Sequence, residues 1–261
     1  YMAINLLEAP VLGMLLALIV RYKNSQHHVA EYVFRYNDNI PAFILISVIV
    51  ALFMGLTVSA EEIIRDKKIQ KRESFLNLSR TSYLFSKIII LFSLSLIQTL
   101  MFVLVGNFIL GIEGLYMTYW LVLFSISCFA NVLGLNISAS FNSAVTVYIL
   151  IQILLIPLMI LSGAIFRFDQ LNNAITKRGK VPIIADFAAS RWAYEALIVE
   201  QFKGNLYEEI FFETELKQRQ NRYKMDFLIP KMEEILDRML DYKVESKGME
   251  NPDSVLINLR N

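Results

Sequence analysis

The sequence has few of the residues from which catalytic and metal-binding sites are built. Its 261 residues include one cysteine and two histidines. A single cysteine excludes an intramolecular disulfide, and Cys128 lies in an apolar run, where it is expected to act as a small buried hydrophobe. His27 and His28 are adjacent and point to different faces of a helix or strand, which favours a surface loop. We therefore expect no catalytic residue and no metal site in this chain.

Two further absences narrow the class of function. The sequence has no G-x-x-x-x-G-K-[ST] phosphate loop, so the chain cannot by itself hold a nucleoside triphosphate in the usual way. The net charge is only +1, which gives no electrostatic case for binding nucleic acid. The start also lacks the basic region of a signal peptide. Because Tyr1 opens directly into an apolar run, we expect the chain to be cut from a longer one.

What the sequence has instead is long apolar segments. Hydrophobic residues make up 56% of the chain, and a helix needs about 20 mostly apolar residues to cross a hydrocarbon core. Five segments meet this requirement: 2–20, 40–60, 88–110, 119–137 and 144–166, the last with a bend expected at Pro157. They predict an all-α membrane protein with five transmembrane helices. Because five is an odd count, we expect a sixth span beyond Asn261.

The densest charge in the first half of the chain lies between the second and third spans, in Glu61–Glu73. Six of the seven Lys and Arg residues between Glu61 and Lys87 precede Phe85, so the positive-inside rule places the loop 61–82 in the cytoplasm. Alternation of the spans then delivers the segment 167–261 to the outer face. We predict two regions on this basis, a transmembrane region 1–166 and a soluble, helical, extracytoplasmic segment 167–261.

Three interpretations of the charged loop stay open. It is a basic loop that holds the topology and nearby anionic lipids, or an amphipathic helix along the inner membrane surface with Ile63, Ile64 and Ile69 toward lipid. The third interpretation is a docking surface that passes motion from a cytosolic ATPase into the spans. Tyr83 and Lys87, at the entrance of the third span, are expected at the level of the lipid headgroups.

Polar residues inside the spans allow two roles. Gln98, Asn131 and Gln152 either hydrogen-bond one helix to another or line a path for a substrate. Small residues at Ala130, Gly134 and Ser138 recur every four positions, which predicts close packing of two helices. The four spans after the first carry no charged residue in their interiors, which disfavours an ion-coupled secondary transporter.

The segment 167–261 contains two readable helices. The first follows Ser190, which is expected to cap it. The second carries an apolar stripe at helical spacing: Met232, Ile235, Leu236, Met239 and Leu240. This stripe needs an apolar partner, either within the segment or in a neighbouring subunit, and by itself it is too short to predict a coiled coil.

Several of these residues together resemble a known family. Glu61, Arg65 and Arg72-Glu73, followed by Leu78, Tyr83, Ser86 and Lys87 ahead of a span, resemble the Glu…Arg-Glu-Arg…Tyr-x-x-Ser-Lys segment of type-2 ATP-binding-cassette (ABC) permeases. The likeness is closest to the G (White) subfamily and its bacterial relatives. Residues 161–166 and 190–197 are similar to the end of that family's fifth span and to the outer-face helix before its sixth. Ser74 and Asn77 depart from the pattern, standing where the family has Arg and commonly Gly.

The resemblance implies six spans per half, dimerisation with a second permease half, and export driven by ATP through alternating access. ATP and Mg²⁺ would bind to a nucleotide-binding domain fused upstream or carried on a separate chain, and no cofactor is expected here. Residues 61–82 would form the elbow helix that touches this ATPase, with coupling through five residues: Glu61, Glu62, Arg65, Arg72 and Glu73. The expected location is the inner membrane of a bacterium. A non-transporting membrane anchor or sensor, whose outer segment binds a protein partner, is the alternative.

Overall fold

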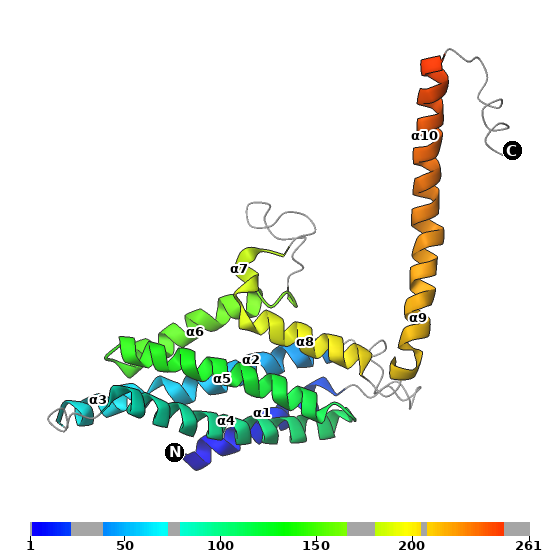
Figure 1. The fold of residues 1–261 in the computed structure, drawn as a ribbon. Helices are drawn as coiled ribbons and strands as arrows, with labels where there is room; N and C mark the ends of the chain where they lie inside the picture. The colour runs from blue at the N-terminus through cyan, green and yellow to red at the C-terminus, as the bar shows by residue number, and fades with distance from the viewer. Residues whose placement is uncertain (1, 22–38, 73–78, 166–180, 205–207, 248–261) are drawn as a thin grey trace. The chain divides into compact units, whose positions relative to one another are not determined.

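The computed structural model describes residues 2–21, 39–72, 79–165, 181–204 and 208–247 (Figure 1). All regular structure in these ranges is helical. The chain divides into two compact units, Tyr1–Glu208 and Glu209–Asn261. The first unit contains the long apolar helices, and its helices are α1 (Met2–Val20), α2 (Ile40–Ala60), α3 (Glu62–Arg72), α4 (Arg80–Leu110), α5 (Tyr116–Ser140), α6 (Ala144–Ile160), α7 (Ile183–Asp186) and α8 (Ala189–Lys203).

Helix α2 forms the centre of the first unit, in contact with α1, α3, α4, α5, α6 and α8. Phe43, Ile44 and Leu52 on α2 are fully buried against these neighbours. Figure 1 shows α2 beside α5, the pair with the most extensive contact, and α1 lies against α4. A helix that is apolar on every side suits this position, because it has helices on several faces.

Glycine lets α2 and α5 approach closely. A Cβ atom added at Gly55 on α2 would lie 2.7 Å from the carbonyl oxygen of Ser127 on α5. One turn further along, a Cβ atom at Gly134 on α5 would collide with the hydroxyl of Ser59 on α2. The row of small residues Ala130, Gly134 and Ser138 is buried at this contact. The prediction of a close helix pair at these positions is therefore confirmed.

The prediction of an all-α membrane protein is confirmed as well. Three helical segments of the described chain are long and apolar enough to cross a membrane: Ile40–Lys67, Thr81–Leu110 and Tyr116–Ser140. Helices α1 and α6 are apolar but shorter, with 19 and 17 residues. They match the first and fifth expected spans in place.

The ends of two helices differ from the expectation. Helix α4 begins at Arg80 and not at 88, because the side chain of Ser79 caps it by accepting a hydrogen bond from the Ser82 N–H. It ends at Gly111, whose left-handed backbone (φ 73°) is accessible to glycine at low cost. Helix α6 ends at Ile160, soon after Pro157, where a span to 166 was expected. Proline removes a helical N–H donor and weakens the helix around it.

Helix α8 belongs to the first unit, since it packs on α2, α5 and α6. The first compact unit extends to Glu208. The predicted division into a transmembrane region 1–166 and an extracytoplasmic segment 167–261 stays a prediction. The expectation that Ser190 caps this helix is wrong. Ser190 is its second residue, Ala188 is the cap position, and the Ser190 hydroxyl donates to the Leu158 carbonyl at 2.6 Å instead. Tyr119 and Gln201 join α5 to α8 through a buried hydrogen bond of 2.8 Å.

The second unit is one long helical run. It consists of α9 (Glu208–Tyr223), a π-helical segment η3 (Lys224–Leu228) and α10 (Ile229–Lys247). The amphipathic helix predicted around Met232–Leu240 is confirmed as part of α10. Its predicted end at Asn251–Asp253 lies outside the described residues.

Candidate functional site

The charged loop of the sequence is a helix, α3, which follows α2 after a break at Glu61. The break leaves the first N–H groups of α3 without carbonyl partners in the helix. The hydroxyl of Ser138 on α5 accepts two of them, from the Ile63 and Ile64 N–H groups, both at 3.2 Å. A side chain from the opposite helix thus caps α3 and fixes where it begins.

One face of α3 is packed into the protein. Ile63 is buried in a cluster with Val58, Leu91 and Leu135, so the expectation that it faces lipid is wrong. Ile69, two turns further on, is 52% exposed. The hydroxyl of Ser138 and the cluster around Ile63 hold the first turn of α3, while its last turn carries exposed Lys71 and Arg72.

Lys87 on α4 joins α4 to α3. Its ammonium lies 2.7 Å from a carboxylate oxygen of Glu62 and 2.7 Å from one of Asp66. These two acids are four positions apart, so they share one face of α3. The Tyr83 hydroxyl donates a hydrogen bond to the Asp66 carboxylate at 2.9 Å. The Lys87 side chain is only 17% exposed, which makes the contact more than a solvated surface pair. Lys87 and Tyr83 were expected at the level of the lipid headgroups, and their contacts with Glu62 and Asp66 were not predicted.

Lys67 ties α3 to the end of α5. Its ammonium donates to the carbonyl oxygens of Ala139 at 3.2 Å and Phe141 at 2.7 Å, and to the side-chain oxygen of Asn142 at 2.9 Å. The last carbonyls of a helix lack partners within the helix and carry partial negative charge, which a cation stabilises. A third tie runs to α6, where the Tyr148 hydroxyl donates to Glu61 at 2.8 Å.

These contacts attach α3, together with Glu61 just before it, to three apolar helices of the first unit. Residues 2–212 match a family described as ABC-2 type transporter. This match covers most of the chain, including α1 to α8. The chain belongs to the ABC-2 type transporter family. A comparison with curated proteins finds no match. The chain is therefore a membrane component of a transporter, in a family whose members pair with an ABC ATPase.

In this ABC-2 chain the five residues expected to couple to an ATPase occupy different positions. Glu62 is central, since it contacts both Lys87 and Arg65, the latter at 2.9 Å. Glu61 contacts α6 through Tyr148. Arg72 is exposed at the end of α3, and Glu73 lies outside the described residues. The structure therefore brings two of the five, Glu61 and Glu62, into contact with the apolar helices, while Arg65 is 54% exposed and pairs with Glu62 on α3 itself.

Three polar residues that were expected on a substrate path lie on three different helices. Gln98 on α4 donates to the Asn5 carbonyl on α1 at 2.8 Å, and Asn131 on α5 donates to the Ser95 hydroxyl on α4 at 2.7 Å. Both are buried, and the remaining amide oxygen of each accepts no hydrogen bond from the described residues. Gln152 on α6 is exposed among apolar neighbours. Their role on a substrate path stays a prediction.

Sequence analysis missed four participants of the α3 site: Asp66, Lys67, Ser138 and Tyr148. One signal was available, because Glu62 and Asp66 have the spacing of two residues on one helical face. Ser138 was noticed only as a small residue at a helix contact, and its second role as a cap depends on where α3 begins. Lys67 and Tyr148 bind residues that are more than 70 positions away in the sequence, and helical periodicity within one segment cannot predict such contacts.

Removing the Ser138 hydroxyl should loosen the start of α3. Ser138→Ala leaves two backbone N–H groups without their acceptor, and we expect a loss of about 1 kcal/mol of stability. Ser140→Ala on the same helix is the matched control, because its hydroxyl returns to the carbonyl of Asn136 in its own helix. Thermal unfolding in detergent measures both. Equal midpoints for the two variants would contradict the capping role.

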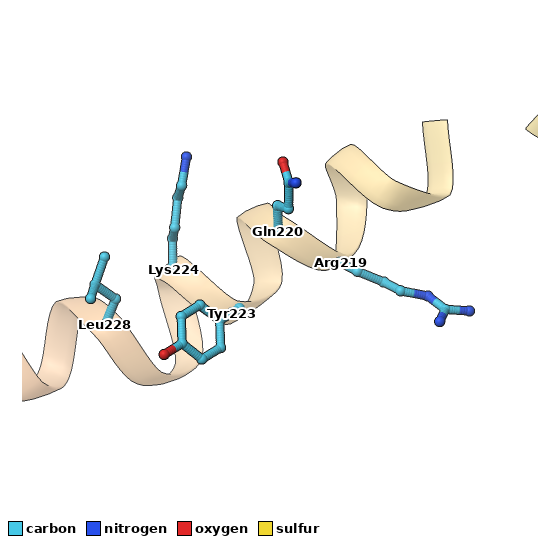
Figure 2. A pocket seen from close by; sticks show the side chains of 5 residues that line it. All are labelled: Arg219, Gln220, Tyr223, Lys224 and Leu228. Atoms are coloured by element: carbon cyan, nitrogen blue, oxygen red, sulfur yellow. The ribbon is translucent and has the colours of Figure 1, made fainter. Parts of the chain in front are cut away.

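The second unit carries a surface hollow of about 370 Å³. Figure 2 shows that its lining residues follow one another along a single helical run, with Arg219 pointing away from Lys224 and Leu228. They are Arg219, Gln220, Tyr223, Lys224 and Leu228. All five come from α9 and η3, so one helical run supplies the whole lining. We assign no ligand to this hollow.

Proposed function

We propose that this ABC-2 chain is the permease part of an ATP-driven exporter, most similar to the G subfamily and its bacterial relatives, in a bacterial inner membrane. An associated or fused nucleotide-binding domain would bind ATP and Mg²⁺ and hydrolyse the ATP. A second permease half would complete the transport path. Family membership speaks for this function and against the alternative of a non-transporting anchor.

The observation that carries the proposal is the attachment of α3 to α4 and α5, and of Glu61 just before it to α6, at one end of the apolar helices. A helix that receives motion from an ATPase must be held firmly enough to pass it on. Lys87 holds α3 to α4 by two ion pairs, and Lys67 holds it to the end of α5. Displacement of α3 then pulls on the ends of the helices that surround the transport path.

The two ends of α3 suit different tasks. Its first turns are bound to the protein through Ser138, Glu62 and Asp66. Its last turn presents Lys71 and Arg72 on the surface. Exposed charge at this end is what a soluble partner can bind, because opposite charges steer and orient association. We assign this end to the ATPase and the cytoplasmic side, in agreement with the positive-inside rule.

Gln98 and Asn131 support the substrate path in this proposal. In an apolar surrounding a buried amide oxygen without a partner is costly, so we expect these two oxygens to accept a hydrogen bond from a polar group of the cargo when the helices around them separate during transport. An apolar path with scattered amides suits an amphipathic cargo.

The coupling role is tested by changing charged residues at the C-terminal end of α3. Arg72→Ala with Glu73→Ala in the assembled transporter should leave membrane insertion and expression unchanged. We expect the permease to lose its stimulation of ATP hydrolysis by the ATPase subunit, because the exposed charge of Arg72, which would meet that subunit, is gone. ATP hydrolysis in proteoliposomes, with and without the permease, gives the measurement. Undiminished stimulation at normal expression would count against α3 as the coupling helix.

A further inference from the structure

Helix α10 in the second unit carries an apolar stripe on the protein surface. Met232, Ile235, Leu236 and Met239 recur at helical spacing on one face, and they are between 46% and 67% exposed. An exposed row of large apolar side chains marks an interaction surface.

The charges beside this stripe are sorted by sign. At about 3.6 residues per turn, Lys231 and Arg238 lie along one edge of the stripe, and Glu233 and Asp237 lie along the other. The stripe therefore has a basic edge and an acidic edge. Arg238 forms an exposed ion pair with Glu234 on the back of the same helix, and such a pair contributes little.

This charge pattern disfavours a lipid surface as the partner. Helices that lie on membranes carry mostly Lys and Arg on their polar side, which attract anionic lipids. Helix α10 has four basic and five acidic residues, a net charge of −1. Its acidic edge would be repelled by anionic headgroups.

The pattern does fit a second copy of the same helix. When two identical helices pair in parallel, the two-fold axis runs along them, and the basic edge of one meets the acidic edge of the other. In an antiparallel pair each edge meets its own equivalent, so like charges are opposed. Edge charges are known to set partner and orientation in paired helices. We propose that α10 pairs in parallel with α10 of a second copy of this chain, through the Met232–Met239 stripe.

This pairing rests on the proposed function in one respect, because it needs two permease copies in one assembly. Helix α10 has 19 residues, and a pair this short is marginal between separate molecules. Two copies already joined through their membrane helices hold their second units at a high effective concentration. Both copies insert in the same direction, which allows a parallel pair.

Cysteine cross-linking in the chain with α10 intact tests the pairing in membranes. Cys128 is the only native cysteine, so Cys128→Ala gives the background. Met232→Cys and Met239→Cys are placed on the stripe, one variant at a time, and Glu234→Cys on the opposite face is the control. After mild oxidation we expect a disulfide-linked dimer from each stripe variant and no such dimer from the control variant.

Orientation is read from the same variants. In a parallel pair, position 232 meets 232 and 239 meets 239, so each variant cross-links to itself. In an antiparallel pair, cross-links would form mainly when chains with Met232→Cys and Met239→Cys are mixed, and this would overturn the parallel arrangement. Cross-linking equal to the control, or adducts only with a different protein, would overturn the surface as a contact between copies.

Charge reversal gives an independent check in the Met239→Cys chain. Lys231→Glu with Arg238→Glu makes both edges acidic, and Glu233→Lys with Asp237→Lys makes both edges basic. Each change alone should lower the cross-linked fraction about fivefold, as several opposite-charge contacts become like-charge contacts. Co-expression of the two chains should restore it between unlike chains. Equal fractions in all combinations would contradict the role of the edges.

The oligomeric state of the membrane part separates this inference from the proposed function. Deleting residues 229–261 should leave a dimer in native membrane discs, because the apolar helices of two permease halves still meet. A dimer of this shortened chain without cross-links in the full chain overturns only the α10 pairing. A full chain that is monomeric in discs and does not stimulate its ATPase overturns the proposed function as well.

Discussion

A single methyl group at Gly55 is expected to destabilise the first unit by about 3 kcal/mol, at the upper end of the usual cost of overfilling a packed interior. The added Cβ would lie 2.7 Å from the Ser127 carbonyl oxygen and 2.7 Å from the Ala130 side chain. A backbone oxygen cannot rotate away, so α2 and α5 must separate. Because α2 contacts most helices of the unit, moving it away from α5 also disturbs its packing against the other helices. Thermal unfolding of Gly55→Ala in detergent, compared with the parent chain, measures the loss.

Gly106→Ala is the matched control on another apolar helix. There a Cβ would lie 3.4 Å from the Phe43 ring, close to ordinary contact. We expect unchanged or slightly higher stability, because alanine favours a helix by up to about 1 kcal/mol over glycine. Adding Ala130→Gly to Gly55→Ala should recover only part of the loss, since the Ser127 carbonyl stays in place. Equal midpoints for Gly55→Ala and Gly106→Ala would contradict the close packing of α2 against α5.

Replacing Lys87 with methionine should give the second large effect. The change leaves Glu62 and Asp66 without the cation that lies between them, in a place that is largely shielded from water. Removing one partner of a buried ion pair typically costs about 3 kcal/mol or more. We expect a lower unfolding midpoint together with loss of ATPase stimulation, since α3 is then no longer held to α4.

The loss of stability in Lys87→Met should be reversed by also removing the carboxylates of Glu62 and Asp66. Adding Glu62→Gln and Asp66→Asn removes both carboxylates and leaves only Arg65 charged, which is 54% exposed to water; neutral groups in place of an ion pair are often as stable as the pair. Stability should therefore return toward that of the parent chain while ATPase stimulation stays low. If the triple variant is no more stable than Lys87→Met, the loss does not come from the unpaired carboxylates.

Much of the fold could be predicted because it depends on local patterns. Length and apolar composition place the membrane helices near 40–60, 88–110 and 119–137, and the structure has helices there. The row Ala130, Gly134 and Ser138 predicted a close contact, and Gly55 on α2 is the residue that it meets. Helical spacing likewise predicted the amphipathic stripe of α10.

The remainder depends on contacts between distant segments. The starts of α4 and α8 differ from the prediction. Helix α4 begins earlier because the Ser79 side chain accepts a hydrogen bond from the Ser82 N–H, and Ser190 does not cap α8 because its hydroxyl donates to the Leu158 carbonyl. Ile63 was expected to face lipid, yet it is buried against Leu91 of α4 and Leu135 of α5. Which helices pack on a residue cannot be read from its own segment alone.

The same limit applies to the α3 site. Its charges were visible in the sequence and predicted a cytoplasmic loop, and the resemblance to a family implied the coupling role. Lys87 was assigned to the headgroup level because long basic side chains commonly lie there. Its pairing with Glu62 and Asp66 requires knowledge of which face of α3 meets α4. Resemblance to a family indicated the region, and the structure supplied the partners.

The central claim, that the exposed end of α3 meets an ATPase, is tested most directly by photo-cross-linking. A photoreactive residue replaces Arg72 in the full transporter, and a second variant carries it in place of Phe108, far along α4 and 79% exposed. The account predicts that the adduct from position 72 is identified by mass spectrometry as a chain or domain with a phosphate loop, and that position 108 gives no such adduct. Absence of that adduct from position 72, in a transporter that inserts and hydrolyses ATP, would contradict it.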